Sequence, residues 1–300
     1  MNFDNPWGFL EDKPQVDRDL RKKNINSLVC GSILTPVVLI FITPLLWLSD
    51  VAFRPKAEIF QVPPRIFQAP PWETIKTYSL DSFRLAIDRY QVNSGFYNSV
   101  LITTATIIFT LLVCSLAAYA FGALRFPGRD TIFFGVLATM MLPTVTMIAP
   151  YYRVLRAYGL INNRWGLIIP YTGCAFGVFL LRQYIVKLPK SFFEAAIIDG
   201  ASRFRVWWQI ILPLTKPGLS ALAIYQFQLV WNDFLTPMIV LRDNNLFTLP
   251  IKLQFMDSVN IAKDYDAMVA TGLIAILIPV IFFIIFQRQF IEGISGGVNE

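Results

Sequence analysis

The sequence predicts an all-α membrane protein with six transmembrane helices. Hydrophobic residues make up 55% of the 300 residues and charged residues only 15%, whereas a soluble domain carries about 25% charged residues. So few charges cannot coat the surface of a compact soluble fold of this size. Long stretches without a charged residue also recur along the chain, and most are close to the roughly 20 apolar residues that cross a bilayer as a helix.

The spans are read from the windows between charged residues. They are expected at residues 25–49, 98–121, 131–152, 165–186, 217–241 and 267–287, and the fifth contains an internal acid, Asp233. The transmembrane domain then covers 25–288, between tails at 1–24 and 289–300. The first apolar run is longer than the ~7–15 residues of a signal peptide, so we expect it to remain as a membrane anchor.

Composition excludes several chemistries. The chain has no histidine, which excludes a Ser-His-Asp triad, a Cys–His dyad and His-ligated metal sites. Its three cysteines, Cys30, Cys114 and Cys174, are far apart and each sits in an apolar run. We therefore predict no catalytic residue and no metal site. The net charge of +6 indicates loops that face anionic lipid and does not indicate nucleic-acid binding.

Six spans place both termini on one side of the membrane. Five Lys and Arg residues precede the first span, and only Arg54 and Lys56 follow it closely. The positive-inside rule then predicts cytoplasmic termini.

Prolines within the spans predict kinked helices; they are Pro36, Pro44, Pro143, Pro150, Pro170 and Pro279. Gly173 and Gly177 have the GxxxG spacing that lets helices approach closely.

Two loops contain short helical patterns. Residues 80–90 alternate apolar and charged side chains at helical spacing, which predicts a surface helix on the outer face. In the loop at 189–216, Ser191 and Glu194 have the S-x-x-E spacing of a capping box, so a helix is expected over Phe192–Asp199. Gly200 follows it and can take the positive φ that ends a helix.

A second amphipathic helix is expected after this glycine. Ser202 can cap it and Pro213 closes it, and its large apolar residues are Phe204, Trp207, Trp208 and Ile211. The pattern therefore predicts a helix–turn–helix that is too short to cross the membrane. Two local interpretations stay open: Glu194 acts only as a cap, and the two tryptophans only anchor the loop at the interface.

The same loop resembles the EAA loop of ABC importer permeases. Residues 194–218 read EAAIIDGASRFRVWWQIILPLTKPG and contain Glu194, Ala195, Ala196, Asp199, Gly200, Ala201 and Pro213 in the family's order. The stretches 98–130, 140–171, 231–241, 247–251 and 287–297 are similar to the carbohydrate subfamily, in particular to the second membrane subunit of maltose-type importers. The chain departs from the family at its end, Val298–Glu300, which lacks the usual basic residues.

The resemblance implies an assembly. Two permeases, usually different, sit on two ATP-binding subunits in the bacterial inner membrane, and an extracytoplasmic binding protein delivers a sugar or sugar-like solute. The EAA loop is the cytoplasmic coupling helix that docks on an ATP-binding subunit, and Ser191, three residues before Glu194, is expected to belong to this coupling site. The chain has no GxxxxGK[ST] motif, so it is expected to be a non-enzymatic subunit without a cofactor, with ATP and Mg²⁺ on its partners.

The fifth span contains the polar residues that a sugar path needs. Tyr225, Gln228, Asn232 and Thr236 are three or four residues apart, so on a continuous helix they share one face. Asp233 lies on an adjoining face, and an acid within a membrane span is a default functional candidate. The alternatives are hydrogen bonds between helices and a helix cap near the outer end of the span.

Two other functions, a secondary transporter and an intramembrane enzyme, are less consistent with the sequence. A secondary transporter for a polar solute is disfavoured because no internal repeat and no chain of intramembrane acids is visible. An intramembrane enzyme is disfavoured because a nucleophile would lack a histidine base. Within the resembled family, glycerol phosphate and glycosylated osmolytes are alternative solutes.

Overall fold

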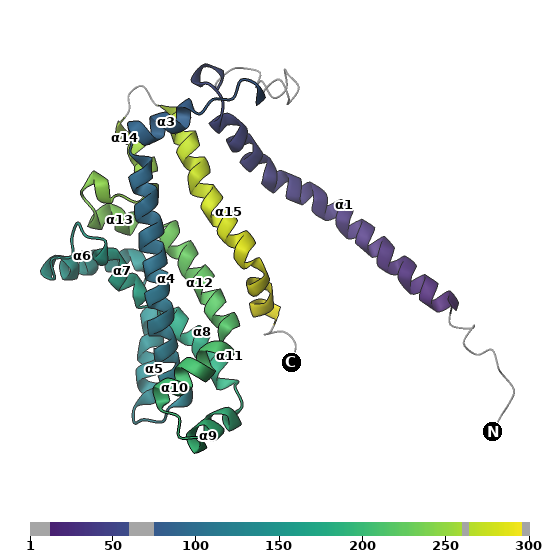
Figure 1. Ribbon diagram of the computed structural model, residues 1–300, viewed down its shortest axis with the longest axis vertical. Helices are drawn as coiled ribbons and strands as arrows, with labels where there is room; N and C mark the ends of the chain where they lie inside the picture. The colour runs from purple at the N-terminus through teal and green to yellow at the C-terminus, as the bar shows by residue number, and fades with distance from the viewer. Residues whose placement is uncertain (1–12, 60–74, 260–263, 296–300) are drawn as a thin grey trace. The chain divides into compact units, whose positions relative to one another are not determined.

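All regular structure in the described residues is helical, which confirms the predicted all-α class. The computed structural model describes residues 13–59, 75–259 and 264–295. Its contacts divide the chain into two compact units, Met1–Tyr78 and Ser79–Glu300 (Figure 1).

The first unit is built on one long helix. Helix α1 runs over Lys13–Ala52 with Pro36 and Pro44 inside it, and the short turn η2 follows at Lys56–Glu58. Described residues of the predicted 1–24 tail thus continue the first helix. At its end Asp50 pairs with Arg54 and accepts a hydrogen bond of 2.7 Å from the Tyr78 hydroxyl. Burial and the neighbouring carboxylate raise the pKa of Tyr78 to about 12.

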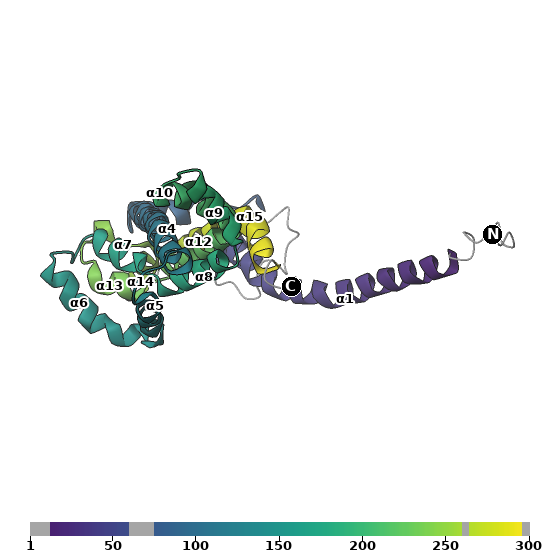
Figure 2. The ribbon, with the colours of Figure 1, turned by 90° about the horizontal axis from the view of Figure 1, so that it is seen from below.

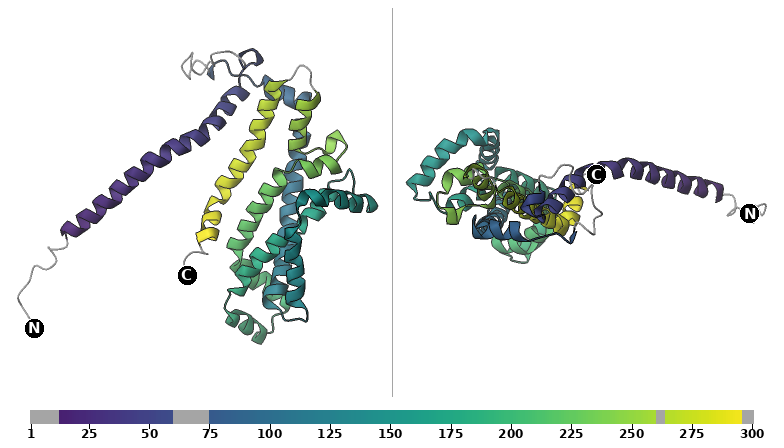
Figure 3. Two further views of the ribbon diagram at one scale, coloured as in Figure 1. Left: turned by 180° about the vertical axis from the view of Figure 1, so that it is seen from behind. Right: turned by 90° about the horizontal axis from the view of Figure 1, so that it is seen from above.

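The second unit is a bundle around α4 (Val92–Ala123). Helix α4 packs against α8 (Ala175–Val186) and α12 (Lys216–Trp231), and α12 also packs against α15 (Tyr265–Ser295). Figure 3 shows α12 between α4 and α15. Close approach depends on small residues: a Cβ at Gly177 of α8 would lie 2.8 Å from Leu222 and 3.0 Å from Cys114. The three helices therefore meet at this glycine.

Four described helical stretches are long and apolar enough to cross a membrane, and a bent pair of helices raises the number to five. The four are Leu34–Ala52, Val92–Ala123, Trp165–Val186 and Tyr265–Gln287. The bent pair is Arg129–Met141 and Thr144–Ala157, at 99°. The remaining predicted span, 217–241, is divided between the 16-residue α12 and α13 (Leu235–Val240). The count of six stays a prediction.

The predicted span 131–152 is not one continuous helix, because it is interrupted at Pro143, one of the prolines at which a kink was predicted. Helix α5 (Arg129–Ala138) and the 3₁₀ turn η4 (Thr139–Met141) end before Pro143, and η5 (Thr144–Met147) and α6 (Ile148–Ala157) follow it. Leu142 is extended, with ψ at 123°, because the ring of a proline disfavours helical geometry in the residue before it. The chain changes direction at this dipeptide.

The predicted span 165–186 is also interrupted. Helix α7 (Trp165–Thr172) stops at Gly173, and α8 starts after Cys174, whose Sγ accepts a hydrogen bond of 3.3 Å from Gly177 N. The two glycines of the GxxxG pair therefore do not lie on one helix. Only Gly177 lies at a helix contact.

One end of the bundle is held together by a buried amide. This end contains α3 (Asp81–Asp88), which matches the predicted surface helix, η7 (Asn244–Leu246) and α14 (Leu249–Val259). Asn98 of α4 is fully buried, and its Nδ2 donates to the carbonyls of Asn245 at 2.7 Å and Phe247 at 3.0 Å. Arg164 Nε donates to Asn98 Oδ1 at 2.9 Å. One side chain thus joins three distant parts of the sequence.

A buried lysine lies at the same end. Lys252 of α14 is 1% exposed, and its Nζ donates to Asn244 Oδ1 at 2.8 Å. Its stem packs against α4, where a Cβ at Gly95 would lie 2.7 Å from Lys252 Cγ. Burial lowers the pKa of Lys252 to about 8, because desolvation disfavours the charged form.

Candidate functional site

The loop at 189–216 forms a helix, a tight turn and a second helix at one end of the bundle. Helix α9 covers Lys190–Ile198, and Phe192 N donates to Pro189 O at 3.2 Å. Ser191 is therefore inside the first turn and not before it, so it does not occupy the capping position that we predicted. The helix itself is present within one or two residues of the predicted Phe192–Asp199.

The turn after α9 has the predicted glycine geometry. Gly200 has φ of +73°, and Ala201 N donates to Ala196 O at 2.9 Å. This six-to-one bond with a left-handed glycine is the Schellman ending of a helix. No atom outside the immediate chain lies within 4 Å of an ideal Cβ at Gly200. The backbone conformation, and not crowding, is what requires glycine here.

The second helix is capped as predicted but does not end where we predicted. Ser202 Oγ accepts from Arg205 N at 3.3 Å at the start of α10 (Arg203–Val206). A π-helical turn, η6 (Trp207–Ile211), and then α11 (Leu212–Leu214) continue the chain almost directly into α12. Pro213 lies inside α11 near its start, where a missing N–H is tolerated. The predicted stop at Pro213 is therefore wrong.

Burial divides the loop into an attached face and a free face. Ala196, Val206 and Trp207 belong to one buried cluster with residues of α4, α8 and α12. Glu194, Ala195 and Asp199 are exposed. Figure 2 views this end of the bundle from below, with α9 and α10 in front. The loop thus presents a short helix outward while its inner face is part of the core.

The predicted polar stripe of the fifth span is only partly continuous. Helix α12 ends at Trp231, so Thr236 belongs to α13 and lies on a different helix from the other stripe residues. Asn232 Nδ2 donates to Gln228 O and Oε1, both at 2.9 Å. Tyr225, Gln228 and Asn232 are exposed in this chain. These three residues form the part of the stripe that the structure retains.

Asp233 acts as a local cap. Its Oδ1 accepts from Leu235 N at 3.0 Å and from Thr236 N at 3.3 Å, at the start of α13. Its Oδ2 accepts a hydrogen bond from the Tyr171 hydroxyl. The carboxylate therefore joins α13 to α7, in agreement with the helix-cap alternative.

A mainly apolar cavity lies beside this carboxylate, and tyrosine and threonine hydroxyls are among its lining. It has a volume of about 190 Å³ and is lined by Thr144, Met147, Ile148, Tyr151, Pro170, Tyr171 and Thr236. Tyr151 OH donates to Gly166 O at 3.0 Å. Sequence analysis missed both tyrosines because they belong to separate helices. The available signal was that each follows a proline, Pro150 or Pro170, within an apolar run.

Comparison with known proteins assigns the chain to a family. Residues 28–296 match the model of the binding-protein-dependent transport system inner membrane component. The chain belongs to this family. It is thus the membrane permease of a transport system that works with a solute-binding protein, and it is a multi-pass membrane protein. The resemblance stated from the sequence is confirmed.

Individual relatives cover almost the whole permease. It is 35% identical to the arabinooligosaccharide transport permease AraQ of Halalkalibacterium halodurans, over 88% of this chain and 93% of that one. It is 31% identical to the diacetylchitobiose uptake permease NgcG of Streptomyces coelicolor, over 86% and 84%. A crystal structure of a bacterial ABC transporter that imports alginate contains a chain with the same fold, with a TM-score of 0.78, 22% identity and coverage of 90% and 98%.

Proposed function

We propose that this permease imports a carbohydrate, as one of two permease subunits placed on two ATP-binding subunits. Relatives named for arabinooligosaccharides and for diacetylchitobiose support a sugar as the solute. The observation that carries the coupling part of the proposal is α9, a short exposed helix fixed at its end by the Gly200 turn. In this proposal α9 docks on an ATP-binding subunit.

The packing of the loop explains how docking transmits force. Ala196 of α9 and Trp207 of η6 share a buried cluster with Leu181 of α8 and Leu222 of α12. Close-packed interiors have low compressibility and transmit displacement. A movement imposed on α9 by closure of the ATP-binding subunits therefore reaches the helices that line the membrane domain. Glu194 and Asp199, both exposed, are the charged groups that meet the partner.

This assignment also orients the chain and places the chemistry elsewhere. If α9 meets an ATP-binding subunit, its end of the bundle is cytoplasmic, in agreement with the basic residues before the first span. ATP and Mg²⁺ bind to the partner subunits, because this chain has no GxxxxGK[ST] motif. In this proposal the permease forms the membrane path and changes conformation, and it is not itself an enzyme.

The solute path follows the remaining polar stripe. One exposed face at the end of α12 carries an aromatic ring with a hydroxyl, from Tyr225, and two side-chain amides, from Gln228 and Asn232. Such groups suit a ligand rich in hydroxyls. Asp233 and Thr236 belong to the path through their position beside the cavity that Tyr171 lines.

Two measurements test these proposals. The purified chain alone is expected to hydrolyse no ATP, whereas the complex with its ATP-binding subunits hydrolyses ATP and accelerates when the loaded binding protein is added. Turnover by the isolated chain would contradict the assignment. For the path, Asn232→Cys in a cysteine-free chain should react with a membrane-impermeant thiol reagent, whereas Trp231→Cys, at a buried position, should not. Labelling of the second and not the first would overturn the face assigned to the path.

A further inference from the structure

A cavity lined by two arginines lies where the loop meets the end of α4. Its volume is about 490 Å³, and its walls include Tyr119, Arg125, Phe193, Ser202, Arg203 and Val206. None of its described lining residues is acidic. One side of the cavity is thus basic and hydroxylated, and the other is apolar.

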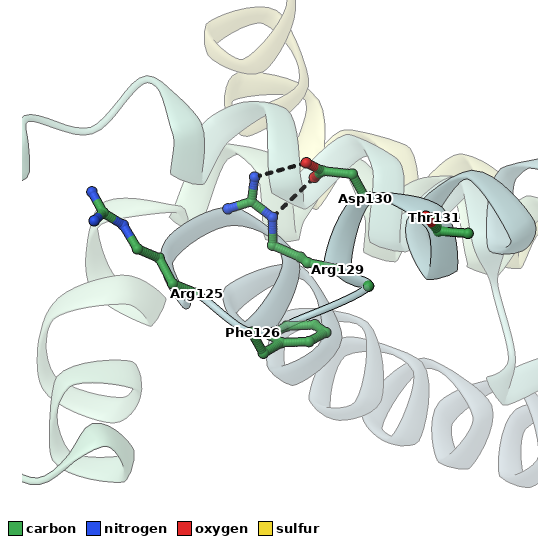
Figure 4. Close-up of a pocket in the computed structure, with 6 residues that line it drawn as sticks. Arg125, Phe126, Arg129, Asp130 and Thr131 are labelled. Carbon is green, nitrogen blue, oxygen red and sulfur yellow. Dashed lines mark hydrogen bonds and ion pairs between the residues drawn. The ribbon is translucent and has the colours of Figure 1, made fainter.

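Arg125 and Arg203 of this cavity form no ion pair with a described residue, unlike the nearby Arg129 and Arg182. Arg129 Nε lies 2.9 Å from Asp130 Oδ1, and Arg182 Nη2 lies 3.9 Å from the same oxygen. Figure 4 shows Arg129 turned toward Asp130, with Arg125 extending away from that pair. Within the ranges that the structure describes, neither Arg125 nor Arg203 forms an ion pair. Two unpaired guanidinium groups therefore line this cavity, and Arg125 also lines the adjoining cavities that include Asp130 and Glu194.

We propose that this cavity binds the phosphate group of an anionic phospholipid from the membrane leaflet on the α9–α10 side. Guanidinium groups match phosphate geometry with paired donors. The hydroxyls of Ser202 and Tyr119 supply further donors, and Ser202 Oγ uses only its acceptor capacity toward Arg205 N. Phe193 and Val206 give an apolar wall for the glycerol end of the lipid.

Neighbouring side chains favour a lipid over a soluble anion. Phe204 is 65% exposed and Trp208 is 59% exposed, and at a spacing of four they share one face of the second loop helix. Exposed aromatic residues beside arginines are typical of the membrane–water interface. The cavity also adjoins Ala123, the last residue of the α4 span. The two arginines, the exposed aromatic residues and the end of the α4 span thus belong to the same end of the bundle.

Native mass spectrometry of the full-length chain in detergent tests the proposal. With dioleoylphosphatidylglycerol at low molar excess, one tightly bound lipid is expected, and dioleoylphosphatidylcholine should bind more weakly. Each basic residue near a charged lipid contributes about a factor of five in affinity, so Arg125→Gln with Arg203→Gln should weaken binding about 25-fold. Arg125→Lys with Arg203→Lys should retain most of the preference. The matched control, Arg84→Gln with Arg242→Gln, removes the same charge far from the cavity and should change nothing.

Four results would overturn the proposal. Equal binding of the two lipids by the wild-type chain would show that no phosphate site discriminates charge. Unchanged phosphatidylglycerol binding by the double Gln variant would place any lipid elsewhere. Displacement of the lipid by an equal concentration of inorganic phosphate would assign the cavity to a soluble anion. Loss of ATP-binding subunits from the double Gln variant, with lipid binding intact, would instead assign the arginines to an acidic protein surface.

Discussion

Gly200→Val tests the turn that ends α9. The residue has φ of +73°, and an ideal Cβ there meets no atom within 4 Å. The added Cβ therefore meets no clash within this chain, and the cost that the structure shows is that of the backbone conformation. A β-branched residue in the left-handed region costs about 1–3 kcal/mol. If that cost releases the end of α9 from its docking geometry, affinity for the ATP-binding subunits falls about 5- to 150-fold.

The chain contains a matched control for this change. Gly159, between α6 and α7, has φ of +67° and equally open space around its Cβ. Gly159→Val should therefore strain the backbone to a similar degree while leaving docking intact. Gly200→Asn should restore docking, because asparagine tolerates the left-handed conformation.

The assay is recovery of ATP-binding subunits with tagged permease from membranes, together with solute uptake. Insertion is checked from the amount of permease in the membrane fraction. Normal docking and uptake by Gly200→Val would refute the role given to the turn. Equal loss of docking in Gly159→Val would show that general strain, and not the position in the loop, causes the effect.

Three further changes have expected outcomes. Asp233→Ala removes the acceptor for two backbone N–H groups of α13 and for the Tyr171 hydroxyl. The free energy of unfolding of the purified chain, measured by thermal unfolding, should therefore fall by about 1–2 kcal/mol. Asp233→Asn should lower it by less. Gly177→Val places a Cβ 2.8 Å from Leu222 and should lower the free energy of unfolding by about 1–3 kcal/mol. Adding Leu222→Ala should recover part of that loss in a double-mutant cycle. If the two changes in unfolding free energy simply add, the contact is contradicted. Lys252 has its folded pKa lowered from 10.5 to about 8, so the unfolded state binds more protons between these values and stability should rise with pH across that window. In Lys252→Met that rise should be absent, and a rise equal to the wild type would contradict the buried amine.

The sequence was sufficient where local chemistry decides the structure. The Gly200 turn and the Ser202 cap involve residues within six positions of each other, and both are present. Apolar windows likewise located the α1, α4 and α15 helices because hydrophobic length is a local property.

Kinks were predicted at the prolines, but which of them would interrupt a helix was not predictable, because the same residue has different effects in different surroundings. Pro36 and Pro279 lie inside continuous helices, whereas the chain turns by 99° next to Pro143. A proline frees a backbone carbonyl, and whether the helix continues depends on which neighbouring groups satisfy it. That information is tertiary, so the polar stripe that assumed an unbroken helix through Thr236 was too long.

The candidate path illustrates the same limit. Tyr151 and Tyr171 lie on different helices and meet at one cavity beside Asp233 only after α6, α7 and α13 have packed. No spacing rule connects residues of three helices. The EAA pattern, in contrast, is contained in one short segment and was visible in full.

The buried amide of Asn98 has a consequence for how the chain is made. Its two carbonyl partners are 147 and 149 residues further along the sequence. At a synthesis rate of about 5–20 residues per second, those carbonyls leave the ribosome roughly 7–30 s after Asn98. During that interval the Nδ2 of Asn98, near the start of α4, lacks both of the carbonyls that accept its hydrogen bonds in the folded chain. A chain truncated between Val240 and Asn245 should therefore be less stable than the full chain, even though every helix up to α13 has already been synthesised.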